Sequence, residues 1–381
     1  MSTSPSNAVG SAKTTSESSL GPLVTLPFPE DNQSFTTDDG VIVQTYDWGG
    51  DGPPLLLAHA TGLHGHVWLP LVQRLRSSFH CYAIDARAQG DTTAPLGGEA
   101  LVERNTVAQE LARNAPAHGS APQPAAPQSN ASQSGASQSG VIQPKPTAPN
   151  SIKNTTESQA SGFAWANITK EYTKAMDLWG LSGRGDVFGF GHSQGGFALL
   201  SASLERPGSF AHVFGFEPVI FLPPENALVG NPMDNFMANI ARKRREVFAS
   251  KQEAYENYRA KLPFKMADDE VTRSYVHWGF EDLPDGGVRL KCRAAWEGEL
   301  FSLSMSDLYH RLPEVDCPVT LGLGEFTSDS FNKSIPLQHA QMPNSSIMHF
   351  PGRSHFGPLE NSDEMAAVIR KVFLGSLESQ P

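Results

Sequence analysis

The sequence feature that most constrains the fold is the stretch from Phe190 to Gly196, which reads Phe-Gly-His-Ser-Gln-Gly-Gly. A short apolar run typical of a buried strand precedes it, and a second apolar run follows it. This order predicts a strand, a sharp turn and a helix, with Ser193 at the tip of the turn. Gly191 and Gly195 fit this prediction because the neighbours of a strained turn residue come too close to tolerate Cβ atoms.

The pattern Gly-x-Ser-x-Gly between a strand and a helix resembles the nucleophile elbow of the α/β-hydrolase superfamily. The resemblance implies an α/β fold with a mostly parallel central sheet flanked by helices. It also implies a mainly helical cap insertion and gives Ser193 the role of nucleophile. Haloalkane dehalogenases and epoxide hydrolases of this fold carry aspartate at the elbow, so a serine here points to acyl chemistry instead.

Composition sets the outer bounds of the interpretation. The chain has 381 residues, of which 39% are hydrophobic, and this is enough for a sizeable core. The formal net charge of −11 argues against nucleic acid or an anionic membrane as a partner. No apolar run reaches membrane-spanning length and residues 1–20 lack the apolar core of a signal peptide, so a cytoplasmic location is expected.

The three cysteines, Cys81, Cys292 and Cys317, are odd in number and lack metal-like spacing, which favours buried free thiols. His64 and His66 lie two residues apart, but no acidic or cysteine partner accompanies them in the sequence. We therefore expect no metal site there.

The domain organisation follows from shifts in composition along the chain. Residues 1–21 are expected to form a disordered tail, 22–220 the first part of the core, 221–313 the cap and 314–381 the second part of the core. Residues 96–161 contain no aromatic side chain and repeat Ala-Ser-Gln-Ser-Gly in tandem. Such a stretch buries too little apolar area to offset its ordering entropy, so a disordered insertion in a surface loop is expected.

The apolar run Leu55–Ala58 predicts a central strand, and the following His59-Ala60-Thr61-Gly62 resembles the family's oxyanion-hole loop. The resemblance implies that the backbone N–H groups of Thr61 and Gln194 hold the negative oxygen of a tetrahedral intermediate. An ordinary loop with a buried His59 is the alternative. The later turn Asp85–Asp91 resembles a structural turn of the family, Asp-x-Arg-Gly-x-Gly.

A serine hydroxyl needs a base and the base needs an orienting acid. His355 matches the family's catalytic histidine because it follows the predicted last strand. Three carboxylates stay open as the acid. Glu217 follows the strand after the elbow helix, whereas Glu325 and Asp329 flank Thr327, the position nearest the family's usual aspartate.

These residues predict hydrolysis of a carboxylic ester, thioester or lactone through an acyl-enzyme on Ser193, with His355 as general base. The expected partner is a small-molecule acyl substrate. The resemblance implies neither a metal nor an organic cofactor. Two alternatives remain at this point: an acyltransferase that uses the same triad, and a non-catalytic ligand-binding protein on this fold.

Overall fold

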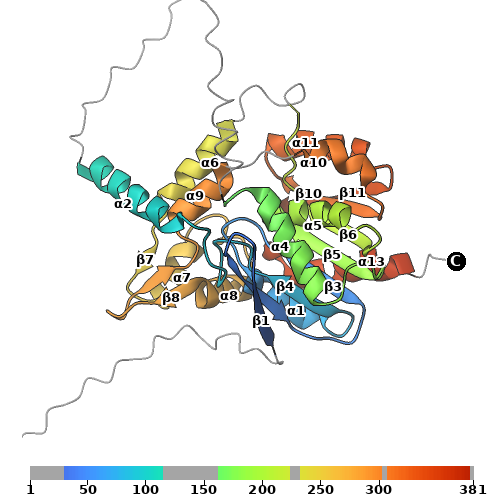
Figure 1. Ribbon diagram of the computed structural model, residues 1–381, viewed down its shortest axis with the longest axis horizontal. Coiled ribbons are helices and arrows are strands. Elements are labelled where there is room, and N and C mark those ends of the chain that lie inside the picture. Colours follow the sequence, from blue (N-terminus) through green and yellow to red (C-terminus); the bar gives the residue numbers. More distant parts are fainter. Residues whose placement is uncertain (1–29, 115–161, 224–231, 303–306, 378–381) are drawn as a thin grey trace, which may run out of the picture.

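The computed structural model describes residues 30–114, 162–223, 232–302 and 307–377 (Figure 1). Its centre is an eight-stranded sheet in the order β1-β2-β4-β3-β5-β6-β10-β11. The strands are β1 Asp31–Thr36, β2 Ile42–Asp47, β3 Pro54–Ala58, β4 His80–Ile84, β5 Val187–His192, β6 Phe210–Phe216, β10 Val319–Phe326 and β11 Ser345–Ser354. The pairs β1–β2 and β2–β4 are antiparallel and all other pairs are parallel, so β2 alone runs against the other strands. The mostly parallel sheet predicted from the sequence is confirmed.

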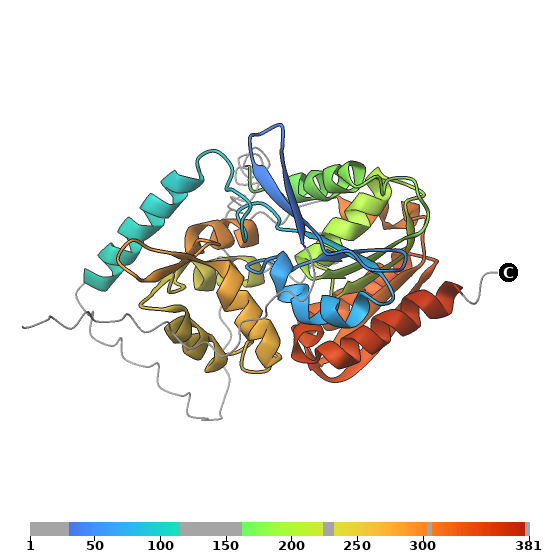
Figure 2. The same cartoon turned by 90° about the horizontal axis from the view of Figure 1, so that it is seen from below.

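The central strands are fully buried, as an apolar parallel sheet covered on both faces requires. One face packs against the 3-10 helix η1 Gly65–Trp68, α1 Leu69–Leu75 and α13 Ser362–Leu377. The other face packs against α4 Trp165–Leu178, α5 Gln194–Glu205 and α11 Asp329–Gln341. Figure 2 shows α13 and α5, the helix that follows Ser193, on opposite sides of the sheet. The short α12 Gly357–Glu360 joins β11 to α13.

The segment between β6 and β10 forms a separate layer beside one end of the sheet (Figure 1). It contains a three-stranded sheet in the order β7-β9-β8. Its elements are α6 Pro232–Arg242, β7 Val247–Phe248, α7 Lys251–Arg259, α8 Asp269–Gly279, β8 Phe280–Asp282, β9 Val288–Leu290 and α9 Ala294–Ser302. The last part of the segment, α10 Leu308–Arg311 and the 3-10 helix η2 Leu312–Glu314, packs on α11 beside the main sheet instead (Figure 1). The cap was expected to be mainly helical, and its helices are joined by this small sheet, in which β7 separates α6 from α7 and β9 is the middle strand.

The boundary predicted for the disordered insertion was wrong at its N-terminal side. Residues within it form α2 Gly98–Asn114, which packs on the cap helix α9. Trp296 of α9 donates from its indole Nε1 to the Gly98 carbonyl at 2.9 Å, and Asn105 donates to the Arg242 carbonyl at 3.1 Å. Its anchoring partners are almost 200 and 140 residues away in the sequence, which is why local composition missed it. Residues 115–161 and the expected N-terminal tail lie outside the described residues.

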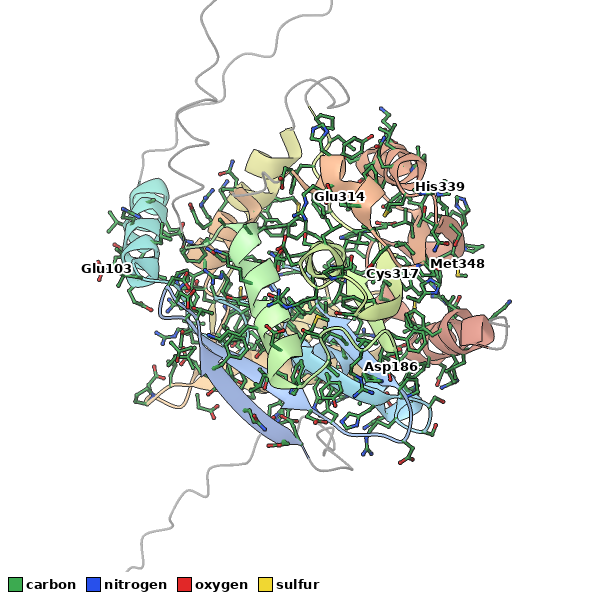
Figure 3. All side chains as sticks on the ribbon, turned by 45° about the vertical axis from the view of Figure 1, so that its right-hand side comes forward. Glu103, Asp186, Glu314, Cys317, His339 and Met348 are labelled. Atoms are coloured by element: carbon green, nitrogen blue, oxygen red, sulfur yellow. The ribbon has the colours of Figure 1, made fainter. Side chains whose placement is uncertain are left out.

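The three cysteines are buried and unpaired, as the sequence predicted. Figure 3 labels Cys317, which lies just before β10 at the sheet. Burial raises the pKa of the Cys81 thiol to about 12 and that of Cys317 to about 12, so both behave as small apolar groups. Among the helices of the described residues, none combines the length and apolarity needed to cross a bilayer.

Candidate active site

Ser193 stands at a tight turn between β5 and α5. Its backbone φ of 56° lies in the left-handed region, which is strained for a residue with a side chain. A Cβ on Gly195 would lie 2.1 Å from the Ala58 carbonyl oxygen, and one on Gly191 would lie 2.6 Å from the backbone of Gly195. Both positions therefore require glycine. The Ser193 N–H donates to the Phe216 carbonyl at 3.0 Å, which fixes the turn against β6.

His355 lies just after β11, with Glu217 beside it. The Nδ1 atom of His355 is 2.7 Å from Oε2 of Glu217, a residue with no exposed surface that directly follows β6. Glu217 also accepts a hydrogen bond from Thr327 Oγ1 at 2.7 Å and one from the Gly324 N–H at 2.8 Å. Three donors thus converge on one buried carboxylate. Since a carboxylate only accepts, Nδ1 of His355 carries the proton and its Nε2 carries the lone pair.

The other two candidate acids make different contacts. Asp329 is the first residue of α11, and no hydrogen bond joins its carboxylate to His355 in the part of the chain that the structure describes. Glu325 accepts from the Gly352 N–H at 2.6 Å, on the exposed side of β10. Thr327, at the position where the family's usual aspartate was expected, donates its hydroxyl to Glu217 instead. The geometry therefore brings His355 together with Glu217, and not with Glu325 or Asp329.

His192 connects the histidine loop to the serine turn. Its Nε2 atom donates to the carbonyl of His355 at 2.8 Å, and the centroids of the two rings lie 4.9 Å apart. Complete burial holds the pKa of His192 well below its usual value, so this ring is neutral and acts as a donor only at Nε2. Phe331 stacks on the His355 ring at 4.6 Å. His355 therefore contacts His192, the residue directly before Ser193, although no hydrogen bond joins the side chains of His355 and Ser193 within the described residues.

The two backbone N–H groups expected to form an oxyanion hole belong to the loop after β3 and to the start of α5, and β3 and β5 are neighbouring strands. Gln194 is the first residue of α5, so its N–H has no acceptor within the helix. The Thr61 N–H makes no hydrogen bond in the described part of the chain. His59 is buried and accepts from the Ala86 N–H at 3.0 Å through Nε2, while its Nδ1 contacts the Ala60 carbonyl at 2.9 Å. His59 thus holds the loop after β3 to the loop after β4, and burial lowers its pKa.

The cap touches the Thr61–Gly62 loop through a charged pair. A Cβ on Gly62 would lie 2.2 Å from Oε1 of Glu297 in α9. Arg244 pairs with Glu297 through Nη1 and donates to the Tyr275 hydroxyl through Nη2. The φ of Gly62 is 79°, a conformation that favours glycine, and a side chain here would also displace the Glu297 carboxylate. The cap thereby closes directly onto the loop that carries one of the expected oxyanion donors.

His64 and His66 lie away from the triad, where the core meets α8. His66 contacts the Glu30 carboxylate at 3.2 Å and stacks on Trp278 with ring centroids 4.1 Å apart. His64 contacts the Tyr275 carbonyl at 3.1 Å. No group of three or more histidine, cysteine or acidic side chains with metal-ligand placement occurs in the described ranges. Both histidines serve packing between core and cap.

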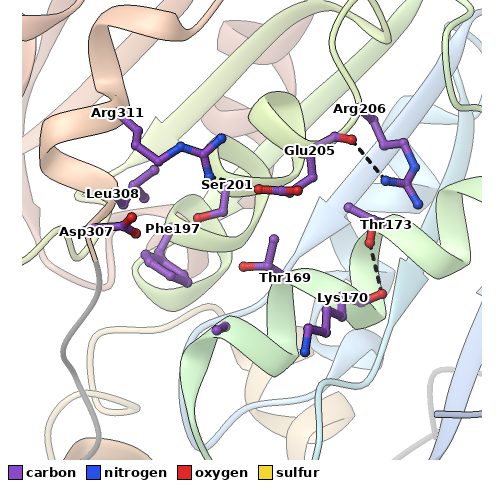
Figure 4. A pocket seen from close by; sticks show the side chains of 11 residues that line it. Thr169, Lys170, Thr173, Phe197, Ser201, Glu205, Arg206, Asp307, Leu308 and Arg311 are labelled. Atoms are coloured by element: carbon purple, nitrogen blue, oxygen red, sulfur yellow. Dashed lines mark hydrogen bonds and ion pairs between the residues drawn. The ribbon is translucent and has the colours of Figure 1, made fainter. Parts of the chain in front are cut away.

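A cavity of about 370 Å³ lies between α4, α5 and the start of α10, and none of its lining residues belongs to the triad (Figure 4). Its walls include Thr169, Lys170, Ser201 and Arg311. Arg311 pairs with Glu205 at 2.8 Å. The elbow helix thus separates this cavity from the candidate active site, since Ser201 lies two turns below Ser193 on α5.

Three residues around the site were not assigned a role from the sequence: His192, Gln89 and Glu297. His192 is part of the elbow motif, so the sequence shows that it lies next to Ser193, but the sequence does not show its hydrogen bond to the His355 carbonyl. Gln89 was placed in a turn judged structural. Glu297 lies in a cap helix whose placement over Gly62 depends on tertiary packing, and no local signal marks it.

Comparison with known proteins identifies the family. The model of the alpha/beta hydrolase family matches residues 55–368. The chain belongs to the alpha/beta hydrolase family. A curated relative, the pimeloyl-acyl-carrier protein methyl ester esterase of Vibrio vulnificus (strain YJ016), is 37% identical over 67 residues, which are 18% of this chain. The match spans only 25% of that relative's length.

Solved structures of other alpha/beta hydrolases superpose over most of the chain. E-2-(acetamidomethylene)succinate hydrolase is 15% identical, with a TM-score of 0.61 and coverage of 91% of this chain and 100% of that one. A peroxisomal alpha-beta-hydrolase from Saccharomyces cerevisiae is also 15% identical, with a TM-score of 0.61 and coverage of 93% and 91%. The thioesterase domain from the curacin biosynthetic pathway is 12% identical, with a TM-score of 0.59 and coverage of 91% and 99%. At these identities the likeness shows the fold alone.

Proposed function

We propose that this alpha/beta hydrolase is a serine hydrolase that cleaves a carboxylic ester, thioester or lactone through an acyl-enzyme on Ser193. The observation that carries the proposal is the 2.7 Å contact between Nδ1 of His355 and the buried carboxylate of Glu217. It orients the ring and leaves the Nε2 lone pair free to act as a base. Two proteins similar to this chain, a methyl ester esterase and a thioesterase domain, are named for reactions of the same class.

In the proposed mechanism, Oγ of Ser193 attacks the acyl carbonyl carbon while Nε2 of His355 takes the hydroxyl proton. The carbonyl oxygen becomes an oxyanion, which the N–H groups of Thr61 and Gln194 stabilise. Collapse of this intermediate expels the alcohol or thiol, which receives the proton from His355. Water then attacks the acyl-enzyme with His355 again as base, and Ser193 is regenerated.

Glu217 is proposed as the orienting acid. It stays ionised beside the imidazolium that forms in each step and stabilises that positive charge. Its other two hydrogen bonds, from Gly324 and Thr327, hold the carboxylate in place while the proton moves. Because Glu217 leaves the strand with a φ of 43°, the chain accepts backbone strain to present it.

Transfer of the acyl group to an alcohol or thiol is the second candidate, since the same residues perform it. Ser193 is 8% exposed and the cap closes on Gly62, so access of water to the acyl-enzyme is restricted. Product partition measured with and without an added alcohol acceptor separates the two activities. Transesterified product that rises in proportion to acceptor, at the expense of free acid, would favour the transferase.

The test of the hydrolase proposal is turnover of a p-nitrophenyl ester series from short to long acyl chains by wild type and Ser193→Ala. We expect release of p-nitrophenol by wild type, and a loss of at least about 10³-fold in Ser193→Ala, in keeping with a triad nucleophile. A folded wild-type protein that turns over none of the series, yet is thermally stabilised by the esters, would favour the ligand-binding alternative. Like the hydrolase activity, the small acyl substrate and the cytoplasmic location expected from the sequence are proposals.

A further inference from the structure

The side-chain amide of Gln89 bridges the two chain segments that carry the proposed oxyanion donors. Its Oε1 accepts from the Gly62 N–H at 2.7 Å, and Gly62 directly follows Thr61. Its Nε2 donates to Oε1 of Gln194 at 3.2 Å. Gln89 has no exposed surface and Gln194 is 1% exposed. Both hydrogen bonds are thus shielded from competition with water.

The direction of this bridge is fixed by chemistry. A backbone N–H can only donate, so Gly62 requires the oxygen of the Gln89 amide. The Gln89 nitrogen must then face Gln194, and Gln194 must present its oxygen. As a result Nε2 of Gln194 is buried without a hydrogen-bond partner in the described part of the chain. An unsatisfied buried donor is unfavourable, and the fixed direction of the Gln89 bridge is what leaves it unpaired.

The turn that presents Gln89 is itself rigid. The Asp85 carboxylate accepts from the Gly65 N–H at 2.6 Å, from the Asp91 N–H at 2.7 Å and from the Tyr46 hydroxyl at 2.6 Å. Ala88, just before Gln89, has a φ of 61°. The Gln89 N–H donates to the Ala86 carbonyl at 3.1 Å. The amide of Gln89 therefore projects from a fixed frame, not from a loop free to adapt.

We propose that Gln89 is a positioning residue that sets the separation of the Thr61 and Gln194 N–H groups in the oxyanion hole. This positioning role rests on the proposed function, because the two N–H groups matter only if an oxyanion forms. Oxyanion donors act through preorganised geometry, and a displacement of a few tenths of an ångström weakens them. Gln89 does this because its single planar amide holds both the N–H of Gly62, the residue after Thr61, and the side chain of Gln194.

The decisive variants are Gln89→Met and Gln194→Met, which keep the side-chain length and remove the amide. Gln194→Met leaves the backbone N–H of residue 194 in place. We expect kcat to fall about 10- to 100-fold in Gln89→Met, somewhat less than the loss from removing a donor itself, with KM within about threefold. Gln194→Met loses only one of the two bonds, so a smaller fall is expected. The double variant should be no worse than Gln89→Met.

The readout specific to the oxyanion hole is the ratio of kcat/KM for an ester to that for the matching thionoester, whose carbonyl sulfur is a poor hydrogen-bond acceptor. We expect this ratio to fall in Gln89→Met by about the same factor as kcat. Gln341→Met is the control, since the Gln341 amide lies at the end of α11, away from the site, and donates to the Tyr309 hydroxyl at 3.4 Å. It should keep both kcat and the ratio.

The results separate this inference from the proposed function. An unchanged ester-to-thionoester ratio in Gln89→Met, in an enzyme that Ser193→Ala inactivates, would overturn the positioning role alone. Wild-type activity in Ser193→Ala would overturn the proposed function, and this inference with it. If Gln89→Met does not fold, Gln194→Met carries the same test, because it breaks the bridge at its other end.

Discussion

Replacement of Glu217 by glutamine tests the proposed triad most sharply, because the amide forces a specific change in His355. Glu217 has to keep an oxygen toward the Gly324 N–H, which can only donate. The glutamine nitrogen then faces Nδ1 of His355 in place of the carboxylate oxygen that lies 2.7 Å away now. Nδ1 must become the acceptor, and the ring proton moves to Nε2. A ring protonated there cannot take the proton of Ser193.

The expected cost follows from this change of tautomer. An amide in place of the triad carboxylate lowers kcat about 10⁴-fold in serine enzymes, which corresponds to about 5 kcal/mol of transition-state stabilisation. KM should change little, because Glu217 is buried behind His355. Glu217→Asp keeps the charge but withdraws it by roughly 1.5 Å, one C–C bond. We expect a smaller loss of about 10²-fold for a displacement of this size.

The assay is steady-state hydrolysis of the best p-nitrophenyl ester by wild type, Glu217→Gln, Glu217→Asp and Asp329→Asn. Thermal unfolding of each variant is the control for folding. Asp329→Asn should remain within about twofold of wild type, since its carboxylate does not contact His355. The reasoning is refuted if Glu217→Gln keeps its rate within tenfold while Asp329→Asn is inactive.

Two further predictions concern stability. Gly195→Ala should lower the free energy of unfolding by about 3 kcal/mol or more, because the new Cβ would lie 2.1 Å from the Ala58 carbonyl oxygen. Urea titration measures the free energy of unfolding, with Gly375→Ala in α13 as a control that should not lower it, because the added Cβ would meet no atom within 4 Å. Burial lowers the pKa of His212 from 6.5 to about 4. The unfolded chain therefore binds the proton first, so stability should fall by about 3 kcal/mol as pH drops from 6.5 to 4. His212→Gln can still form a hydrogen bond with Thr320, and it should remove this part of the dependence of unfolding free energy on pH. An unchanged pH dependence in His212→Gln would contradict the prediction.

The parts of the fold that the sequence predicted are those with strong local patterns. The elbow around Ser193 needs only a strand, two glycines and a helix in order. The strands of the sheet are apolar runs with few alternatives. The position of His355 followed from the order of three features: a last strand, a loop that contains the histidine, and a helix of clear periodicity. In each case the evidence lies within about ten residues.

What the sequence left open depends on contacts between distant segments. Glu217 was one of three candidate acids, and what distinguishes it is its contact with His355, 138 positions away in the chain. Helix α2 was assigned to the disordered insertion because residues 96–161 as a whole contain no aromatic side chain and have a low-complexity composition. The hydrogen bonds that anchor α2 are made with the cap, to the Trp296 indole and the Arg242 carbonyl. Strand β7 is two residues long and has no periodicity to detect.

The central claim, an acyl-enzyme on Ser193, is tested most directly by rapid mixing of wild type with a p-nitrophenyl ester, followed by acid quench and peptide mass spectrometry. The account predicts a burst of one p-nitrophenol per enzyme and an acyl group on the peptide that contains Ser193, with neither in Ser193→Ala. Turnover by folded Ser193→Ala at the wild-type rate, or an acyl group on another residue, would contradict it.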